Sequence, residues 1–338
     1  MNEGKKVLVT GASGFIGHYL IQMLLDHGYD AYAGVRKGSR TQELLQMGAK
    51  LVYLNMDSTQ ILREELRLLH GQIGRWEFVV HTAGVTKCRD RKDFNRVNNE
   101  NTRRLLDVLS EEDMIPDKFI FISSLSVYGP IHEEDGLPIH EEDVPLSDTA
   151  YGCSKLSAED YLRSLKNIPF VILRPTGVYG PREKDYFMMA QSIQRHIDVS
   201  VGFRPQILTF VYVADVCQAV LRSMESELTN RCYALTDGKE YTSRDFSDLI
   251  QKELRVKTVF RFCLPLWVLK TVSFSAQMIA SWLGRSSTLN LDKYRIMKQR
   301  NWRCDITPAC RELGYTPEYD LARGVKETIN WYKKEGWL

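Results

Sequence analysis

Gly11-Ala12-Ser13-Gly14-Phe15-Ile16-Gly17 directly follows the apolar run KVLVT at residues 6–10 and leads into a stretch with helical spacing. In such a loop the first glycine permits a tight turn, the second lets the backbone approach a pyrophosphate, and the third lets helix and strand pack closely. The helix N-terminus then offers free N–H groups and the positive end of its dipole to phosphates. The pattern predicts a dinucleotide site that includes Gly11, Ser13, Gly14, Phe15, Ile16 and Gly17.

The first half of the chain alternates short apolar runs with helical patterns. Further runs cover residues 30–36, 51–55, 77–83, 118–124 and 169–175. Most are nearly continuously apolar, which is typical of strands buried on both faces of a parallel sheet. Helical spacing covers residues 15–27, 58–70, 98–109 and 150–165. This alternation predicts an α/β fold with a doubly wound Rossmann parallel sheet.

The second half is less regular. TFVYVADV at residues 209–216 and RCYAL at residues 231–235 indicate further strands, and helical patterns follow to the C-terminus. We therefore expect residues 1–177 to form the dinucleotide-binding domain, with the chain returning to its sheet near 209–235. Residues 178–208 and 236–338 would form a smaller, mostly helical and discontinuous substrate lobe.

Composition excludes several classes of protein. The 338 residues are 43% hydrophobic and 26% charged, the formal net charge is +2, and no long basic run occurs. A nucleic-acid-binding surface is therefore not expected. The seven cysteines form no CxxC pair, which argues against a disulfide framework and a zinc site, so no metal is expected. The start MNEGKKVLVTG lacks a long apolar run and predicts a cytoplasmic protein without a signal peptide.

A second motif can carry proton chemistry. Ser124 ends the run at 118–124, and Tyr151 and Lys155 lie one turn apart on one face of the helix that follows. A phenol has a pKa of about 10, and a neighbouring ammonium lowers it, so that tyrosine can exchange a proton with a substrate oxygen near neutral pH. A second Tyr-x-x-x-Lys, Tyr294 to Lys298, has no such strand end upstream, and we interpret it as an ordinary helical pair.

Together, GASGFIG, the strand end SSLSVYG at 123–129 and Tyr151-Gly152-Cys153-Ser154-Lys155 resemble the extended short-chain dehydrogenases/reductases, the NAD-dependent epimerase/dehydratase superfamily. The resemblance runs to about Asp237 and more loosely to the end. It includes the fourth-strand motif His81-Thr82-Ala83-Gly84. It also includes VNNENT around Asn98, where Asn101 replaces the family's glycine.

The resemblance implies roles for individual residues. Ser124, Tyr151 and Lys155 would be the catalytic triad, supported by Asn98, and hydride would move between the substrate and a nicotinamide. Lys155 would bind the nicotinamide ribose, Asp57 would contact adenine, and the segment from Pro175 to Val178 would flank the nicotinamide. The remaining cofactor contacts would come from Thr82, Ala83 and Gly84. The family also pairs the helices equivalent to 98–109 and 150–165 across a two-fold axis, which implies a homodimer.

The end of the second strand bears on cofactor choice. It reads Val35-Arg36-Lys37-Gly38-Ser39-Arg40, with no carboxylate to bind a ribose 2′-hydroxyl. Arginine suits a 2′-phosphate, so Arg36 and Lys37 favour NADP over NAD. The alternative is that these residues form only a solvated basic loop.

Three departures from the family's pattern bear on the reaction class. Leu125 and Ser126 stand where dehydratases carry an Asp-Glu pair. Gly177 stands where sugar-nucleotide enzymes usually have an asparagine that contacts the diphosphate, and Leu208-Thr209 replaces their usual Arg-Asp. A diphosphate would lose charge-assisted contacts worth roughly 1.5–3 kcal/mol each.

The segment from Phe262 to Gly284 has one charged residue, Lys270. Lys270, Ser273 and Gln277 form a narrow polar stripe at helical spacing, and the remainder is apolar nearly all round. Such a helix is expected to be buried as core or lid, to lie at a membrane interface as a peripheral contact or, least favoured, to span a membrane. The region resembles 3β-hydroxysteroid dehydrogenases and their sterol- and flavonoid-reducing relatives. Trp267 and Phe274 would then face an apolar pocket.

The pattern as a whole predicts an NAD(P)-dependent dehydrogenase or reductase. It would act on a secondary alcohol or ketone of a small apolar substrate, with a 3β-hydroxysteroid-like molecule as the best single example. A nucleotide-sugar epimerase remains the alternative among enzymes. A non-catalytic cofactor-sensing protein remains the alternative outside them, although it would not need Tyr151 and Lys155.

Overall fold

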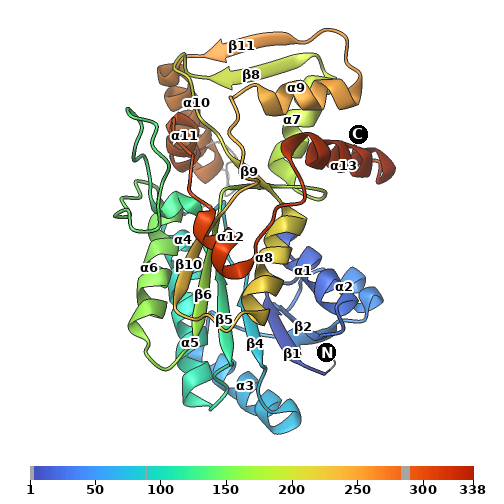
Figure 1. Ribbon diagram of the computed structural model, residues 1–338, viewed down its shortest axis with the longest axis vertical. Coiled ribbons are helices and arrows are strands. Elements are labelled where there is room, and N and C mark those ends of the chain that lie inside the picture. Colours follow the sequence, from blue (N-terminus) through green and yellow to red (C-terminus); the bar gives the residue numbers. More distant parts are fainter. Residues whose placement is uncertain (1–3, 89, 283–289) are drawn as a thin grey trace.

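A seven-stranded parallel sheet forms the centre of the computed structural model, which describes residues 4–88, 90–282 and 290–338 (Figure 1). Its strand order is β10-β6-β5-β4-β1-β2-β3, and every neighbouring pair is parallel. The strands are β1 (Lys6–Thr10), β2 (Asp30–Val35), β3 (Lys50–Tyr53), β4 (Phe78–His81), β5 (Lys118–Ile122), β6 (Phe170–Pro175) and β10 (Arg231–Leu235). The predicted doubly wound Rossmann sheet is confirmed.

Helices cover both faces of this sheet. Alternate residues of β1 show why its run is continuously apolar, because Val7 and Val9 enter one hydrophobic core and Leu8 the other. The first core is covered by α1 (Phe15–Asp26), α2 (Gln42–Met47), α8 (Val213–Glu225) and α12 (Thr307–Leu313). The second is covered by α3 (Thr59–Ile73), α5 (Asn101–Glu111) and α6 (Ala150–Ser164). Two short elements, α4 (Lys92–Asn95) and the π-helix η1 (Arg96–Glu100), lead into α5.

The return of the chain to the sheet is shorter than predicted. β10 lies beside β6 as expected, but β9 (Phe210–Tyr212) pairs with β7 (Gly177–Tyr179) outside the main sheet. The predicted strand at 209–216 was wrong beyond Tyr212, where α8 begins. Val213, Val216 and Val220 are buried at helical spacing, so the helical period outweighs the preference of valine for strands.

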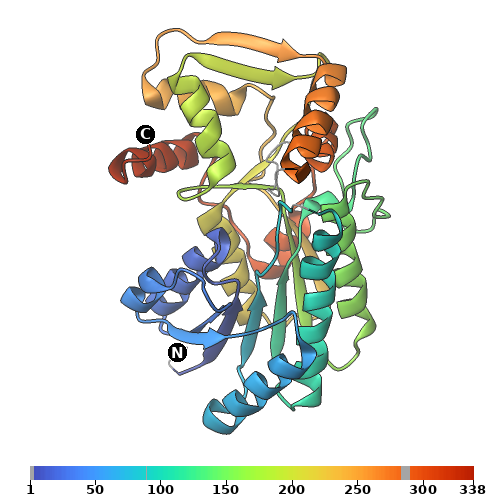
Figure 2. The same ribbon diagram turned by 180° about the vertical axis from the view of Figure 1, so that it is seen from behind.

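The smaller lobe lies at the other end of the molecule, beyond the carboxyl ends of the main strands (Figure 2). It contains α7 (Lys184–Gln194), α9 (Asp245–Leu254), α10 (Leu266–Trp282), α11 (Leu291–Lys298) and α13 (Leu321–Lys334). It also contains a parallel strand pair that the sequence did not predict, β8 (Ile197–Val201) and β11 (Phe260–Leu264). Within the described ranges, no helix has the length and apolar character needed to cross a membrane.

The apolar segment from Phe262 to Gly284 differs from its expected burial. Residues 262–264 belong to β11, α10 begins after Pro265, and residues 283–284 lie outside the described part. On α10, Leu269 and Ser273 are buried, whereas Trp267 and Phe274 are exposed. The expectations of a buried core helix and of a pocket wall at Trp267 and Phe274 are therefore wrong for this structure. The outward face of α10 is the feature that remains to be explained.

Candidate active site

The glycine loop has the geometry that its sequence predicts. Gly11 has φ +72°, and a Cβ atom there would lie 2.7 Å from the Cα of Ala83. A Cβ on Gly17 would collide with the carbonyl oxygen of Gly11, so helix α1 can pack this closely only with glycine at that position. Gly14 is the N-cap of α1, and no described side chain caps its free N–H groups. An uncapped helix start beside a loop of glycines fits a pyrophosphate.

Side chains behind the loop tie β1 to β4. The Oγ1 atom of Thr10 lies 2.8 Å from Nδ1 of His81, and Nε2 of His81 lies 2.9 Å from Oγ1 of Thr102 on α5. Burial, with a smaller effect of the Lys155 charge, lowers the pKa of His81 to about 3, so the imidazole stays neutral. The hydroxyl of Thr82 donates to the carbonyl oxygen of Thr10 (2.7 Å). These contacts hold Thr82 and Ala83 beside the glycine loop.

Asn98 lies on the π-helix η1 and is fully buried. Its Oδ1 accepts from the Val85 backbone N–H (2.8 Å), and its Nδ2 donates to the Val85 carbonyl (3.0 Å) and to Oγ of Ser154 (3.0 Å). Gly84 separates Asn98 from Lys155, since a Cβ there would lie 3.1 Å from Oδ1 of Asn98 and 3.3 Å from Nζ of Lys155. The structure thus brings Gly84, Asn98 and Lys155 together, as the sequence suggested.

Tyr151 and Ser124 meet across the end of β5 and the start of α6. Ser124 caps the short 3₁₀ helix η2 (Leu125–Val127), and its Oγ accepts from the Ser126 backbone N–H (3.2 Å). The Ser124 hydroxyl donates to Oγ of Ser126 (3.1 Å), and its position next to Tyr151 lowers the pKa of that phenol. The ring of Phe94 packs edge-on against the Tyr151 ring, with the centroids 6.2 Å apart. The phenol therefore packs against an apolar ring and has the Ser124 hydroxyl next to it.

The electrostatics of the pair differ in one respect from the sequence prediction. Burial raises the pKa of Tyr151, and the adjacent Ser124 hydroxyl only partly offsets that effect. Burial also lowers the pKa of Lys155 to about 8, with Glu159 acting in the opposite direction. Lys155 donates to the carbonyl oxygen of Ile122 (2.8 Å) and lies 4.7 Å from the centre of the Phe121 ring. The expected lowering of the tyrosine pKa is thus wrong for this structure, because desolvation dominates.

A buried ion pair supports α6 one turn after Lys155. Arg174 on β6 donates to both carboxylate oxygens of Glu159 (3.0 and 2.5 Å), and the pair is almost fully buried. Burial alone would raise the pKa of Glu159, but the hydrogen bonds and charge of Arg174 outweigh it and keep that pKa low. Removing either partner would leave an uncompensated buried charge. The pair fixes the helix that carries both catalytic candidates.

The predicted cofactor-specificity residues lie on the surface. Arg36 and Lys37 follow β2 directly and are exposed, and no ion pair among the described residues engages either side chain. The carboxylate of Asp57 is already partnered, because Oδ1 accepts from Arg96 and from Nδ2 of Asn101 (3.2 Å). The contact of Asp57 with adenine therefore stays a prediction, which rests on the position of this residue after β3.

Pro175 and Val178 lie where the chain leaves β6 and enters β7. Between them, Gly177 is closely covered, because a Cβ there would lie 2.8 Å from Oη of Tyr186. The Tyr186 ring stacks on Phe246 with centroids 4.5 Å apart. Thr209 is buried, and its hydroxyl donates to the carbonyl of Trp302 (2.6 Å). The positions that depart from the sugar-nucleotide pattern are thus filled by apolar and internally bonded groups.

Two acidic residues of the lobe reach this site and were missed by sequence analysis. Asp292 on α11 accepts from the backbone N–H groups of Ala150 (2.8 Å) and Tyr151 (3.3 Å), so it caps the catalytic helix from a segment 141 residues away. Asp185 on α7 pairs with Lys87 after β4 and with Lys293 on α11 (3.0 Å). No local sequence pattern points to either contact, since both partners are distant in the chain.

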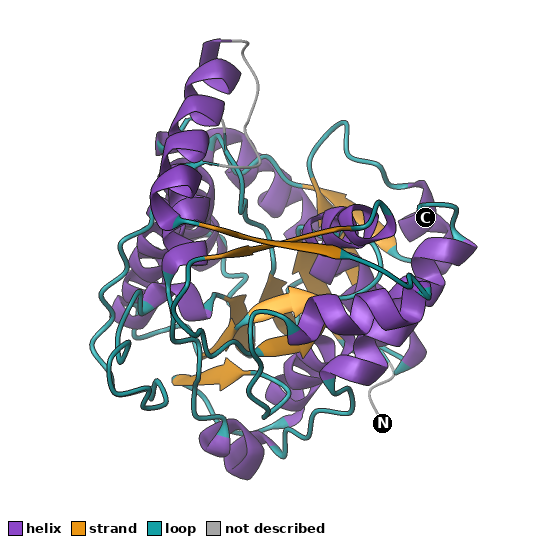
Figure 3. Ribbon diagram, turned by 90° about the horizontal axis from the view of Figure 1, so that it is seen from above, coloured by secondary structure: helices purple, strands orange, loops and turns teal. Residues whose placement is uncertain are grey.

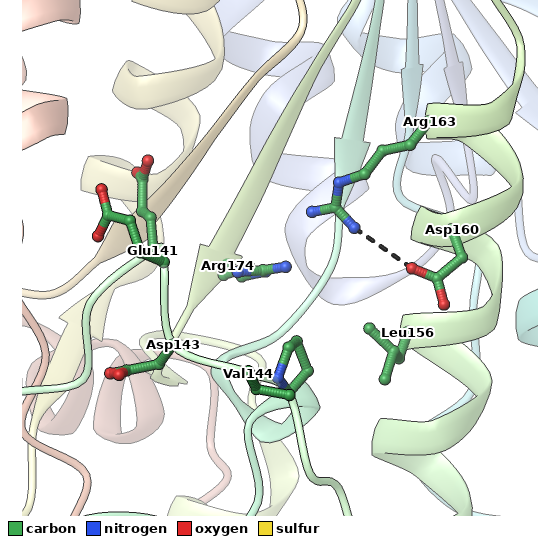
Figure 4. A pocket seen from close by; sticks show the side chains of 9 residues that line it. Glu141, Asp143, Val144, Leu156, Asp160, Arg163 and Arg174 are labelled. Carbon is green, nitrogen blue, oxygen red and sulfur yellow. Dashed lines mark ion pairs between the residues drawn. The ribbon is translucent and has the colours of Figure 1, made fainter.

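A separate pocket of about 470 Å³ lies between α6, the loop that precedes it and Arg174 of β6 (Figure 4). Arg163, Asp160 and Leu156 border it from α6, and Glu141 and Asp143 from the loop that precedes this helix. Burial raises the pKa of Glu141 to about 7 despite the opposing charge of Arg174. None of the four predicted catalytic residues borders this pocket, so we do not assign the reaction to it.

Comparisons with known proteins agree with this geometry. Residues 7–235 match the NAD dependent epimerase/dehydratase family. A putative UDP-glucose 4-epimerase of Methanocaldococcus jannaschii is 26% identical, over 97% of this chain and 98% of its own. A ceramide reductase of Caulobacter vibrioides is 24% identical (98% and 96%), and a decarboxylating sterol-4-alpha-carboxylate 3-dehydrogenase of Dictyostelium discoideum is 23% identical (96% and 99%).

The fold is also that of solved members. The crystal structure of Thermotoga maritima UDP-glucose 4-epimerase with UDP-glucose has a TM-score of 0.77, with 22% identity over 98% of this chain and 99% of that chain. The family match covers well over half of the sequence and includes the glycine loop and the Tyr151 to Lys155 helix. The chain therefore belongs to the NAD-dependent epimerase/dehydratase family of enzymes, the extended short-chain dehydrogenases/reductases.

Proposed function

We propose that the protein is an NAD(P)-dependent oxidoreductase that interconverts a secondary alcohol and a ketone on an apolar substrate. When bound, the nicotinamide supplies or accepts the hydride. Tyr151 donates its phenolic proton to the substrate oxygen during reduction and accepts it during oxidation. Burial keeps this phenol protonated, which is the form needed to donate. Ser124 holds the same oxygen through its hydroxyl, and the Ile122 carbonyl, which accepts a hydrogen bond from Lys155, keeps this lysine in place.

The close approach of Tyr186 to Gly177 is the observation on which the proposed apolar substrate rests. Sugar-nucleotide enzymes resembling this chain place an asparagine at that position for the diphosphate. Here even a Cβ atom would lie 2.8 Å from the Tyr186 hydroxyl, and stacking on Phe246 limits how far that ring can move. Leu208 stands where a cation would be needed. A diphosphate would therefore lose its hydration without compensating contacts.

Two of the relatives, by their names, act on ceramide and on a sterol carboxylate, which are largely apolar molecules. The relatives named as UDP-glucose 4-epimerases support the alternative, a nucleotide-sugar epimerase. A non-catalytic cofactor-sensing protein is disfavoured, because it would not require the buried arrangement of Tyr151, Lys155 and Asn98.

For the cofactor we propose a preference for NADP over NAD. Arg36 and Lys37 are exposed beyond β2, at the position where an NAD-preferring site would have a carboxylate. Arg36→Asp should weaken NADP binding at least about tenfold more than NAD binding, because it puts a like charge beside the 2′-phosphate. Isothermal titration with both cofactors measures the ratio. An unchanged NADP/NAD ratio would show that the basic loop is only a solvated surface.

Direct binding to the cofactor-loaded protein tests the substrate class. We expect a 3-ketosteroid or a ceramide to bind with micromolar affinity or better and UDP-glucose to bind at least about a hundredfold more weakly. Tyr151→Phe serves as a matched control, because it should keep ligand binding while turnover is lost. Micromolar binding of UDP-glucose with no binding of either apolar molecule would contradict the proposal and support the epimerase.

A further inference from the structure

The outer face of the β8–β11 pair carries apolar side chains in the positions where polar ones are expected. Phe260 is paired in register with Ile197, and Phe262 with Val199, so the four side chains form one exposed block. Phe260 is 64% exposed. The molecule seen from above shows this pair lying across the outermost part of the lobe (Figure 3).

The charged residues between them face helix α9. Asp198 is buried, and its Oδ2 accepts from the hydroxyl of Ser247 on α9 (2.9 Å). Arg261 pairs with Asp248 on the same helix. In a strand, alternate side chains face opposite sides, and a sheet with one covered face normally buries its apolar set. In the β8–β11 pair the arrangement is reversed. The apolar side chains lie on the exposed face, and the charged ones lie on the face that is covered by α9.

Helix α10, which follows β11 directly, shows the same reversal. Trp267, Phe274, Met278 and Trp282 lie at spacings of seven, four and four residues, which place them on one helical face, and all four are exposed. The buried side includes Ser273, whose hydroxyl is fully buried without a hydrogen-bond partner among the described residues. An unpaired buried hydroxyl is costly. Together with the β8–β11 block, this stripe forms what we call the apolar face.

Within the two sequence segments that carry the apolar face, the exposed charges have one sign. Segments 195–208 and 255–282 hold six Lys and Arg residues against a single Asp, the buried Asp198, whereas the remaining chain has 39 basic and 42 acidic residues. Five of the six cations are exposed and have no ion-pair partner among the described residues: Arg195, Arg204, Arg255, Lys257 and Lys270. An otherwise slightly acidic protein therefore concentrates unpaired positive charge beside its exposed aromatic residues.

We propose that the apolar face docks onto the surface of a lipid bilayer that contains anionic headgroups. Tryptophan and phenylalanine would enter the headgroup and acyl boundary, and the surrounding cations would contact the lipid phosphates. A second copy of this chain fits less well, because a two-fold contact would place the same cations opposite one another. The proposal is independent of the substrate, since it needs neither turnover nor the nicotinamide.

Flotation of the 338-residue chain with vesicles tests the proposal. We expect binding to vesicles of phosphatidylcholine with phosphatidylglycerol, much weaker binding to phosphatidylcholine alone, and loss of binding at high salt. The double variant Trp267→Gln, Phe274→Gln should reduce the partition coefficient about tenfold or more. Leu45→Gln with Leu68→Gln is the matched control, because both leucines are exposed on helices of the Rossmann half. That control should bind as the wild type does.

Charge variants separate the electrostatic contribution to vesicle binding from the contribution of the apolar side chains. Lys257→Glu and Lys270→Glu should each lower binding about fivefold or more, whereas Lys166→Glu, an exposed lysine after α6, should leave it unchanged. Since these residues are exposed, circular dichroism should show intact folding. Failure of the wild type to float with anionic vesicles would overturn the proposal. So would equal binding to neutral vesicles. A dimer in light scattering that the Trp267 and Phe274 variant abolishes would instead assign the face to a second copy.

Discussion

Two helices of this chain carry the same Tyr-x-x-x-Lys spacing, and their surroundings differ in every respect that matters for proton transfer. Tyr151 and Lys155 start α6, where the tyrosine meets Ser124 and the lysine is buried against the Ile122 carbonyl. Tyr294 and Lys298 lie on α11, where Lys298 is exposed. The spacing only places two side chains on one helical face. Burial, a strand end that supplies a hydroxyl, and a nearby glycine loop create the site.

The largest expected difference between the two copies is in turnover. Tyr151→Phe removes the transferable proton and keeps the ring against Phe94, so kcat should fall about a hundredfold or more while cofactor binding is kept. Tyr294→Phe should leave kcat within about twofold. Cofactor absorbance under saturating substrate measures both variants. Near-normal turnover of Tyr151→Phe would remove the proposed acid from the mechanism.

The free energy of unfolding should depend on pH through the buried Lys155. Burial lowers the pKa of Lys155 to about 8 from 10.5 in the unfolded chain. Between pH 8 and 10.5 the unfolded state therefore binds more protons, and the free energy of unfolding rises with pH. Relative to Lys155→Met, the wild type should gain about 3 kcal/mol across this window. Denaturant titrations at several pH values test it. A constant difference between the two proteins would show that Lys155 is not desolvated.

Lys298→Met provides the control for this comparison. Lys298 is exposed at the end of α11, so its replacement should change the free energy of unfolding by less than about 0.5 kcal/mol at neutral pH. A larger loss would mean that the second copy has a structural role that its exposure does not indicate.

A smaller effect than that of Tyr151 or Lys155 is expected at the residue that links the two copies of the motif. Asp292 lies on the helix of the second copy and caps the helix of the first. Asp292→Ala should cost about 0.5–2 kcal/mol of stability, as loss of a helix cap does, and lower kcat several-fold with little change in KM. Asp292→Asn keeps an acceptor and should recover most of the lost turnover. If both variants match the wild type in kcat, the cap only stabilises the fold.

The sheet and the core of the site were predictable because their signals are local. Periodicity gave the six strands of the first half, and GASGFIG and Tyr151 to Lys155 each specify a geometry within one loop or one helical turn. The family resemblance then placed Ser124 and Asn98. The structure brings these residues together, although their catalytic and cofactor-binding roles remain predictions. So do the homodimer, the cytoplasmic location and the domain boundaries.

The remainder was not predictable because it depends on contacts between distant segments. The reversed polarity of β8–β11 accompanies contacts with α9, where Ser247 and Asp248 bind Asp198 and Arg261. The cap by Asp292 and the ion pairs of Asp185 likewise join segments about 100 to 140 residues apart. The rise in the pKa of Tyr151 results from burial, which the sequence does not reveal. Sequence periodicity carries no information about such pairings.

The π-helix that carries Asn98 also limits how this protein can change during evolution. A π-turn is about one residue longer than an α-turn, so deleting one residue within Arg96–Glu100 would restore regular helix geometry. The same deletion would rotate Asn98 by about 100° away from Val85 and Ser154. Point substitutions at the exposed positions of this turn should be tolerated, whereas changes in its length should not. A deletion that makes this helix more regular could stabilise the fold, but it would displace Asn98 and so lower activity.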